Sequence, residues 1–301
     1  MVSCMNFNEM LTTKVNNIEQ IIQTFLPKEE GYQKTVLEAL HYSMLSGGKK
    51  LRPLLMQEVY EAFGGKSEVV KPFMAAMEMI HTYSLVHDDL PAMDDDEYRR
   101  GRKTTHIVYG EAMAILTGDA LLNYAFETAL TAFDIASEED FVRIARALQV
   151  LAKKAGIDGM IGGQVCDIES ENSSVDVSAD TLMFIHGHKT AALIEASMMI
   201  GGILAGASSS QVDALEKSAY DLGVAFQIQD DILDVTSTFE ELGKPIGSDV
   251  DNHKQTYVSI YGLERAKEEV KRLSKEAIEL LNLEENTFLV QLFESLINRN
   301  K

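Results

Sequence analysis

Apolar residues recur at helical spacing along almost the whole 301-residue chain, and no alternating run of apolar and polar residues is long enough to predict a strand. We therefore expect helices over residues 8–25, 33–46, 51–63, 68–90, 107–133, 138–154, 157–170, 178–205, 209–237, 256–282 and 285–299. No linker or shift in composition divides the sequence. The simplest expectation is one all-α domain covering residues 1–301.

The composition excludes several kinds of partner. With 46% hydrophobic and 25% charged residues, the chain resembles an ordinary soluble globular protein. Its formal net charge of -20 repels nucleic acid and anionic lipid, so neither is an expected partner. The most apolar long run, residues 191–207, contains Glu195 and three glycines and is too short to cross a bilayer, so we expect a buried core helix there.

The expected location is the cytoplasm. The only cysteines, Cys4 and Cys166, lie far apart in the sequence and predict no disulfide framework. The first ten residues lack the basic and apolar regions of a signal peptide.

A strongly acidic segment follows one of the predicted helices. Six of ten consecutive residues, beginning at Asp88, are acidic, and Arg99 and Arg100 come shortly after them. Because Pro91 cannot continue a helix, Asp88 and Asp89 are expected in its last turn. A helix C-terminus is itself negative, so neighbouring carboxylates there repel one another and the dipole. Either solvent or a hard divalent cation, Mg²⁺ or Ca²⁺, can balance this charge.

A second acidic cluster favours the metal. Gln227, Asp230 and Asp234 share one face of a predicted helix whose apolar residues mark it as largely buried. Carboxylates on a buried helix must be paired or bind a metal, and helical bundles commonly build metal sites from facing helices. Mg²⁺ usually takes one or two carboxylates together with phosphate oxygens, which makes a diphosphate the natural third party.

These residues carry a family resemblance. DDxxxxD followed by Arg-Arg-Gly, and then a distant DDxxD, resembles the two aspartate-rich motifs of the trans-isoprenyl diphosphate synthases. The form His-Thr-Tyr-Ser-Leu-Val-His-Asp-Asp-Leu-Pro-Ala-Met-Asp most resembles the bacterial farnesyl diphosphate synthases. The resemblance extends from about residue 40 to the C-terminus. It implies the isoprenoid synthase fold, in which ten or more helices surround a central cavity, and a homodimer.

The resemblance also implies a metal set and two substrate sites. Three Mg²⁺ per active site would be held by the carboxylates of Asp88, Asp89, Asp94, Asp230 and Asp234. Isopentenyl diphosphate would bind at Gly48, Lys49, Arg52, His81 and Arg100. The allylic diphosphate would bind at Arg99, Lys189, Thr190, Gln227, Lys244 and Lys254. Catalysis would rest on Asp88, Asp94, Arg99, Lys189, Thr190, Asp230 and Lys244.

The segment around Gly47 and Gly48 supports an anion site on its own chemistry. A flexible glycine pair enters a helix with Lys49 and Arg52 three residues apart, which brings two cations and free amides together. An ordinary basic loop remains the alternative reading. Family members usually have Arg where this chain has Lys50, which keeps the charge but loses the planar guanidinium.

Several other polar residues have more than one interpretation. Gln164 and Asp167 resemble the Gly-Gln-x-x-Asp stretch of the family, and either could line the pocket or be a satisfied core residue. Cys166 is expected to be a small buried residue, not a nucleophile. His186 and His188 are two residues apart, so a helix would point them in different directions and not at one metal.

The implied reaction is head-to-tail alkylation. Isopentenyl diphosphate would condense with dimethylallyl or geranyl diphosphate to give farnesyl diphosphate and diphosphate, with Tyr83 and Ser84 below the first aspartates limiting the product length. Geranyl or geranylgeranyl diphosphate remain alternative products, and Mn²⁺ remains an alternative metal. Terpene cyclisation or head-to-head condensation, a non-catalytic regulatory subunit and an acidic Ca²⁺-binding protein are the rival functions.

Overall fold

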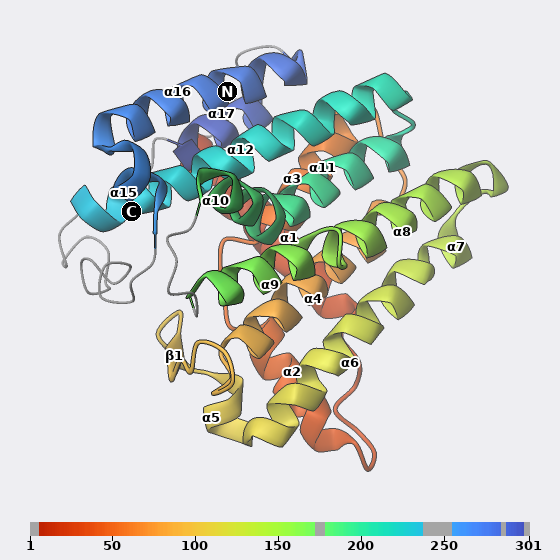
Figure 1. Cartoon of the computed structure of the whole chain (residues 1–301). Helices are drawn as coiled ribbons and strands as arrows, with labels where there is room; N and C mark the ends of the chain where they lie inside the picture. Colours follow the sequence, from red (N-terminus) through yellow and green to blue (C-terminus); the bar gives the residue numbers. More distant parts are fainter. Residues whose placement is uncertain (1–5, 172–177, 237–254, 284–286, 298–301) are drawn as a thin grey trace. The chain divides into compact units, whose positions relative to one another are not determined.

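The structure is a computed structural model that describes residues 6–171, 178–236, 255–283 and 287–297 (Figure 1). Within these ranges the protein is all-α, as predicted, apart from two strands of two residues each. Two compact units are present: one comprises residues 1–149 and 200–206, and the other comprises residues 150–199 and 207–301. No described helix is both long and apolar enough to cross a membrane.

The first unit is built around α4 (Val70–Asp88), whose Phe73, Met74, Met77 and Ile80 side chains have no exposed surface. The helices that pack against α4 include α1 (Phe7–Thr24), α2 (Lys34–Met44), α3 (Leu51–Ala62), α6 (Glu111–Leu130) and α7 (Ala132–Ile135). The remaining elements are β1 (Tyr98–Arg99), β2 (Arg102–Lys103), α5 (Thr105–Tyr109), the 3₁₀ helix η1 (Glu138–Asp140) and most of α8 (Phe141–Ala155). Because α4 is buried along its length, its C-terminal carboxylates are held in a fixed place.

The second unit is built around the long helix α12 (Ser209–Thr236). The elements that pack against α12 include the π-helix η2 (His186–Ala191), α15 (Tyr257–Tyr261), α16 (Leu263–Leu281) and α17 (Phe288–Ile297). Preceding η2 are α9 (Met160–Glu171) and α10 (Ala179–Ile185). Following it is α11 (Ala192–Ala205), whose residues 200–205 belong to the first unit. Helix α11 is almost entirely buried, which confirms the core helix expected over residues 191–207.

The helix boundaries depart from the predicted ranges where the backbone changes conformation. Gly110 and Gly262 have φ of 83° and 84°, so each ends one helix and begins the next. The predicted helix over residues 178–205 contains the π-turn of η2. The prediction that the chain has no strand was wrong at β1 and β2, because strands of two residues are too short to show alternation.

Candidate functional site

The acidic segment after α4 folds back on the helix that precedes it. Helix α4 ends at Asp88, and Asp89 is its C-terminal cap, as predicted. The backbone N–H of Asp94 donates to the carbonyl oxygen of Asp88 over 2.9 Å, and Asp95 donates to Leu90 over 3.1 Å. The residues between the second and third aspartates of DDxxxxD therefore form a loop that returns Asp94 to the end of α4.

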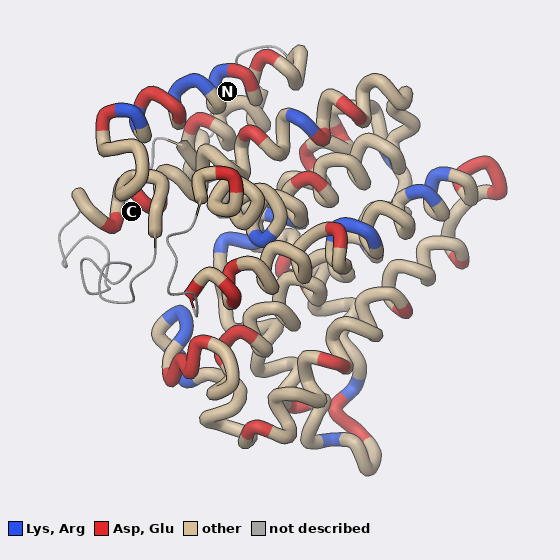
Figure 2. Tube along the Cα trace, in the orientation of Figure 1, with Lys and Arg blue, Asp and Glu red and all other residues tan. Residues whose placement is uncertain are grey.

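A β-hairpin turns the two arginines in different directions. Strands β1 and β2 pair with Tyr98 opposite Lys103 and Arg99 opposite Arg102. The two turn residues, Arg100 and Gly101, have φ of 53° and 74°, which is typical of a type I′ turn. Figure 2 shows the basic hairpin next to the acidic segment that precedes it.

Each arginine contacts a different group. The Nε of Arg99 donates to Asp89 over 2.5 Å, whereas Arg100 donates from a terminal nitrogen to the carbonyl oxygen of Gly47 over 2.6 Å. The Asp89 side chain is buried, and burial raises its carboxyl pKa against the opposing effect of Arg99. The two adjacent arginines therefore point toward different groups.

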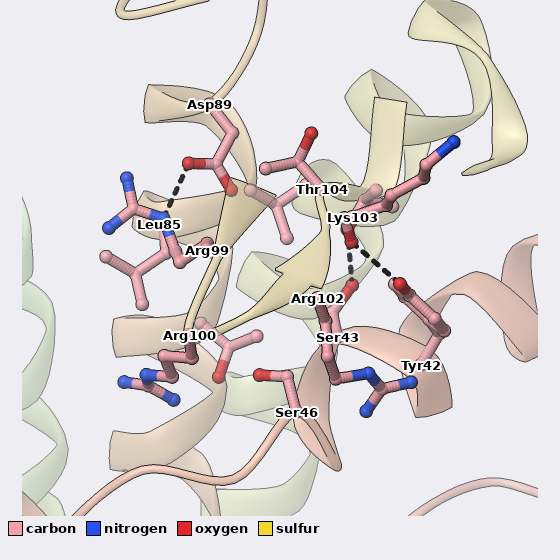
Figure 3. A pocket seen from close by; sticks show the side chains of 13 residues that line it. Tyr42, Ser43, Ser46, Leu85, Asp89, Arg99, Arg100, Arg102, Lys103 and Thr104 are labelled. Atoms are coloured by element: carbon pink, nitrogen blue, oxygen red, sulfur yellow. Dashed lines mark hydrogen bonds and ion pairs between the residues drawn. The ribbon is translucent and has the colours of Figure 1, made fainter. Parts of the chain in front are cut away.

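The hairpin is fastened to the C-terminal part of α2 (Figure 3). The Tyr42 hydroxyl donates to the carbonyl oxygen of Lys103 over 2.7 Å, and the Arg102 guanidinium lies 4.3 Å from the centre of the Tyr42 ring. Arg102 also donates to the carbonyl of Leu45 over 3.1 Å. A pocket in this unit is lined by residues that include Tyr42, Ser43, Ser46, Asp89, Arg99, Arg100, Arg102 and Thr104.

Arg52 and His81 lie close to Arg100, which lines this pocket. A terminal nitrogen of Arg52 lies 3.4 Å from Nε2 of His81, and Arg52 Nε is buried with no hydrogen-bond partner among the described residues. Burial, opposed by Glu78 and helped by Arg100, lowers the pKa of Arg52 to about 10. Burial and then the neighbouring cations lower the pKa of His81 well below its usual value. Such a cluster suits an anion.

The glycine loop makes room for this cluster. Gly48 has φ of 109°, and a Cβ atom there would lie 2.4 Å from a terminal nitrogen of Arg100. No side chain fits at this position without moving the guanidinium. Lys49, the other predicted cation, is exposed.

The residues below the first aspartates pack between α4 and α6. The Tyr83 ring is 5% exposed and lies edge-on to the His87 ring, with centroids 5.9 Å apart. Burial, and then the charge of Asp88, raises the pKa of Tyr83 to about 12. The ring of His87 occupies the space that a side chain at Gly118 would need, since a Cβ there would lie 2.0 Å from Nε2. Ser84 donates its hydroxyl proton to the carbonyl of His81.

A pocket in the second unit brings together the predicted residues Lys189, Thr190 and Gln227, but its lining contains neither Asp230 nor Asp234. Its lining includes Asp167, His186, Lys189, Thr190, Gln227 and Asp231. The Lys189 ammonium donates to Asp167 over 2.5 Å, and the Thr190 hydroxyl donates to Gln227 over 3.1 Å. Asp231 accepts the backbone N–H of Tyr257 over 2.7 Å.

Glycines let the π-helix approach its neighbours closely. A Cβ at Gly163 of α9 would lie 2.1 Å from the backbone nitrogen of Lys189, and one at Gly223 of α12 would lie 2.5 Å from the Ala191 Cβ. The backbone that presents Lys189 and Thr190 therefore lies against both helices. Gly163 is the glycine of the Gly-Gln-x-x-Asp stretch, and nothing in the helical periodicity signals the π-turn.

The two histidines of η2 point in different directions, as predicted. His188 stacks on Phe184, whereas His186 is 5% exposed and has Nε2 4.0 Å from an oxygen of Asp231. Burial lowers the pKa of His186 to about 4, so its ring is neutral at neutral pH. Cys166 is partly exposed, so the expectation that it is buried was wrong.

The chain matches the family model described as polyprenyl synthetase over residues 33–295. This chain belongs to the polyprenyl synthetase family. Membership confirms the resemblance drawn from the aspartate motifs, and it establishes the chain as a trans-prenyl diphosphate synthase, a prenyltransferase.

Relatives and solved structures of the family agree over most of the chain. A geranylgeranyl diphosphate synthase of Cyanophora paradoxa is 42% identical over 299 residues, covering 98% of each chain. A farnesyl diphosphate synthase of Geobacillus stearothermophilus is 42% identical over 266 residues, covering 88% of each. A geranyltransferase of Helicobacter pylori, solved with magnesium and isoprenyl diphosphate, is 31% identical with a TM-score of 0.81, covering 99% of this chain and 98% of that one. The names of these relatives specify products of different chain length, so the comparisons favour no single product.

Magnesium is the metal of polyprenyl synthetases in general. Among the described residues, no three His, Cys, Asp or Glu side chains form a metal site by themselves. The donors still fit Mg²⁺, because that ion is usually held by one or two carboxylates and completes its shell with water and phosphate oxygens. The backbone fold-back brings Asp94 beside Asp88, and their carboxylates are the candidates for such a pair. Lys244 and Lys254, two predicted ligands of the allylic diphosphate, lie outside the described residues.

Proposed function

We propose that this synthase condenses isopentenyl diphosphate head to tail with dimethylallyl and then geranyl diphosphate, giving farnesyl diphosphate and diphosphate. The observation that carries the proposal is the cluster of Arg52, His81 and Arg100 beside the acidic end of α4. A synthase needs two diphosphate sites, of which one is served by carboxylates and metal and the other by cations alone. A terpene cyclase, with a single diphosphate substrate, has no use for the second.

In this proposal the chain's own residues divide the work. Isopentenyl diphosphate is held so that its double bond faces the allylic carbon. The residues that hold it are Lys49, Arg52, His81 and Arg100. The allylic diphosphate is held by a second group of residues, which stabilise its negative charge as the carbon–oxygen bond breaks. This group consists of Arg99, Lys189, Thr190, Gln227, Lys244 and Lys254. The carboxylates of Asp88, Asp89, Asp94, Asp230 and Asp234 would hold Mg²⁺, which would neutralise the diphosphate and make it a good leaving group. Three Mg²⁺ per active site and a single domain over residues 1–301 are also part of this proposal.

Farnesyl diphosphate is proposed as the product because an aromatic residue at the position of Tyr83 is, by the family resemblance, a feature of short-chain farnesyl synthases. Tyr83 lies five residues before Asp88 on the same helix, and its ring is nearly fully buried against the His87 ring. Along a helix axis that separation is about 7.5 Å, which puts the ring at a depth where it can stop a growing prenyl chain. Geranylgeranyl diphosphate is the second candidate, since relatives such as the Cyanophora paradoxa enzyme make it by name.

Product analysis tests the proposal directly. The chain is incubated with dimethylallyl and isopentenyl diphosphates and Mg²⁺, and the products are identified by mass spectrometry. A product of fifteen carbons supports the proposal, and a cyclic or head-to-head product would refute it. Tyr83→Ala should lengthen the products beyond fifteen carbons, whereas an unchanged product profile would refute the role of Tyr83.

A homodimer is also proposed, and exposed apolar residues of α5 and α6 in the first unit support it. Five aliphatic residues of α5 and α6 are between 40% and 50% exposed: Ile107, Val108, Ile115, Leu116 and Leu130. Exposed apolar patches on soluble proteins commonly mark protein interfaces. Sedimentation equilibrium should give twice the chain mass of 33.4 kDa, and a single-chain mass would exclude the dimer.

A further inference from the structure

A buried ion pair lies beneath the loop that enters the isopentenyl diphosphate site. The Lys50 side chain is 4% exposed and that of Glu78 is 2% exposed, and the Lys50 ammonium lies 2.9 Å from a carboxylate oxygen of Glu78. The same ammonium donates to the carbonyl oxygens of Gly47 over 3.1 Å and Met44 over 3.2 Å. An ammonium group has three donors, and all three are used by these oxygens.

The three acceptors belong to different parts of the first unit. Met44 ends α2, Gly47 lies in the glycine loop, and Glu78 lies on α4. Lys50 itself is the N-terminal cap of α3 and has φ of 45°. One side chain therefore joins three helix segments at the point where the loop turns.

The Gly47 carbonyl links this ion pair to the arginine of the hairpin. It accepts hydrogen bonds from both Lys50, over 3.1 Å, and Arg100, over 2.6 Å. Glu78 precedes His81 by three residues on α4, so both lie on the same face of that helix. The ion pair is thus bonded to the loop whose Gly47 carbonyl accepts from Arg100. Through Glu78 it also lies in the turn of α4 that includes His81.

We propose that Lys50 is a positioning residue for the cation cluster: paired with Glu78, it fixes the Gly47 carbonyl and, through it, the Arg100 guanidinium. Lys50 does not bind the diphosphate, since its three donors are already used and it is buried. This inference rests on the proposed function, because it takes Arg52, His81 and Arg100 as the isopentenyl diphosphate site.

The inference also explains the departure from the usual Arg of the family. Three oxygens surround the ammonium, which matches the three donors of lysine. A guanidinium in the same place would keep the positive charge and the contact with Glu78. Because it has five donors, two of them would lack an acceptor among these three oxygens. Lys50→Arg should therefore preserve most of the positioning.

The test removes both charges together. Lys50→Met alone leaves Glu78 buried without its partner and can unfold the unit. The variant Lys50→Met/Glu78→Met replaces both side chains with apolar ones of similar length. Its matched control is Lys14→Met/Glu58→Met, which removes an ion pair of 2.6 Å between α1 and α3 whose Glu58 is 7% exposed. Thermal unfolding establishes that both variants fold.

Steady-state kinetics then separate positioning from stability. For Lys50→Met/Glu78→Met, KM for isopentenyl diphosphate should rise about tenfold, while KM for geranyl diphosphate and kcat change less than about threefold. The control should leave all three constants within about twofold, and Lys50→Arg should keep KM for isopentenyl diphosphate within about threefold. An unchanged KM for isopentenyl diphosphate, or an equal rise in both KM values, would overturn the inference.

A binding measurement keeps this inference distinct from the proposed function. Inorganic pyrophosphate is titrated by calorimetry in the presence of a chelator, so that only the metal-free site is probed. The Kd should rise about tenfold in Lys50→Met/Glu78→Met and not in the control. This result holds even if the wild-type chain makes none of the proposed product, in which case the proposed function fails and the role of Lys50 stands. Equal Kd values in wild type and variant would refute the role of Lys50.

Discussion

Arg52 and His81 illustrate how burial sets the charge of single residues in the candidate site. The pKa of Arg52 falls to about 10 but stays above neutral pH, so the guanidinium remains charged. The pKa of His81 falls well below its usual value, so its ring is neutral. The cluster therefore combines permanent cations with a neutral ring that can donate or accept a hydrogen bond.

Gly48→Ala tests the close contact between the loop and Arg100. The added Cβ would lie 2.4 Å from the guanidinium, so Arg100 must move and KM for isopentenyl diphosphate should rise about tenfold in steady-state assays. Gly64→Ala is the matched control, because Gly64 also has a positive φ, of 85°, but no atom within 4 Å of the added Cβ. If both variants change KM equally, backbone strain and not the contact is responsible.

His186 predicts a pH dependence of stability. The unfolded chain binds a proton at this residue near pH 6.5 and the folded chain only near pH 4, so acidification stabilises the unfolded state. Between about pH 7.5 and about pH 5, the free energy of unfolding should fall by about 2 kcal/mol more in wild type than in His186→Gln. Urea unfolding at both pH values measures this difference, and parallel losses would show that His186 is not buried as a neutral ring.

At the scale of elements, the hairpin of β1 and β2 matters most because it carries both Arg99 and Arg100. Its turn holds Arg100 at a positive φ, and its position depends on the contacts of Tyr42 and Arg102 at α2. The arginines therefore owe their separate directions to the hairpin and not to helical geometry.

Tyr42→Leu should loosen this attachment. The variant loses both the hydrogen bond to Lys103 and the contact with the Arg102 guanidinium, so KM should rise for both diphosphate substrates, by about fivefold each. Tyr42→Phe keeps the ring and should show a smaller rise. If both KM values of Tyr42→Leu equal those of wild type, the position of the hairpin does not depend on its contacts with α2.

The sequence could predict the helices and name candidate residues on them, but not the elements that position those residues. Long apolar periodicity located α4 and α12, and the aspartate spacing located the acidic clusters on them. The sequence did not predict the hairpin, because its strands have two residues each. It did not predict η2, because a π-turn leaves helical periodicity almost unchanged. Glu78 and Tyr42 could not be assigned either, since their roles depend on contacts with residues 28 and 61 positions away in sequence.

At the scale of the whole molecule, the net charge of -20 opposes the binding of anionic substrates. The cation cluster in the first unit reverses the sign locally, whereas Lys189 in the second is paired with Asp167. A central claim of the proposed function is that Asp88 of one unit and Asp230 of the other serve the same diphosphate.

The most direct test of this claim is a crystal structure with Mn²⁺ in place of Mg²⁺ and a non-cleavable allylic diphosphate analogue. Anomalous scattering from manganese locates the ions without ambiguity. The account predicts ions that bridge one diphosphate to Asp88 on one side and to Asp230 on the other. Ions or diphosphates bound to Asp88 and Asp230 in two separate cavities would contradict it.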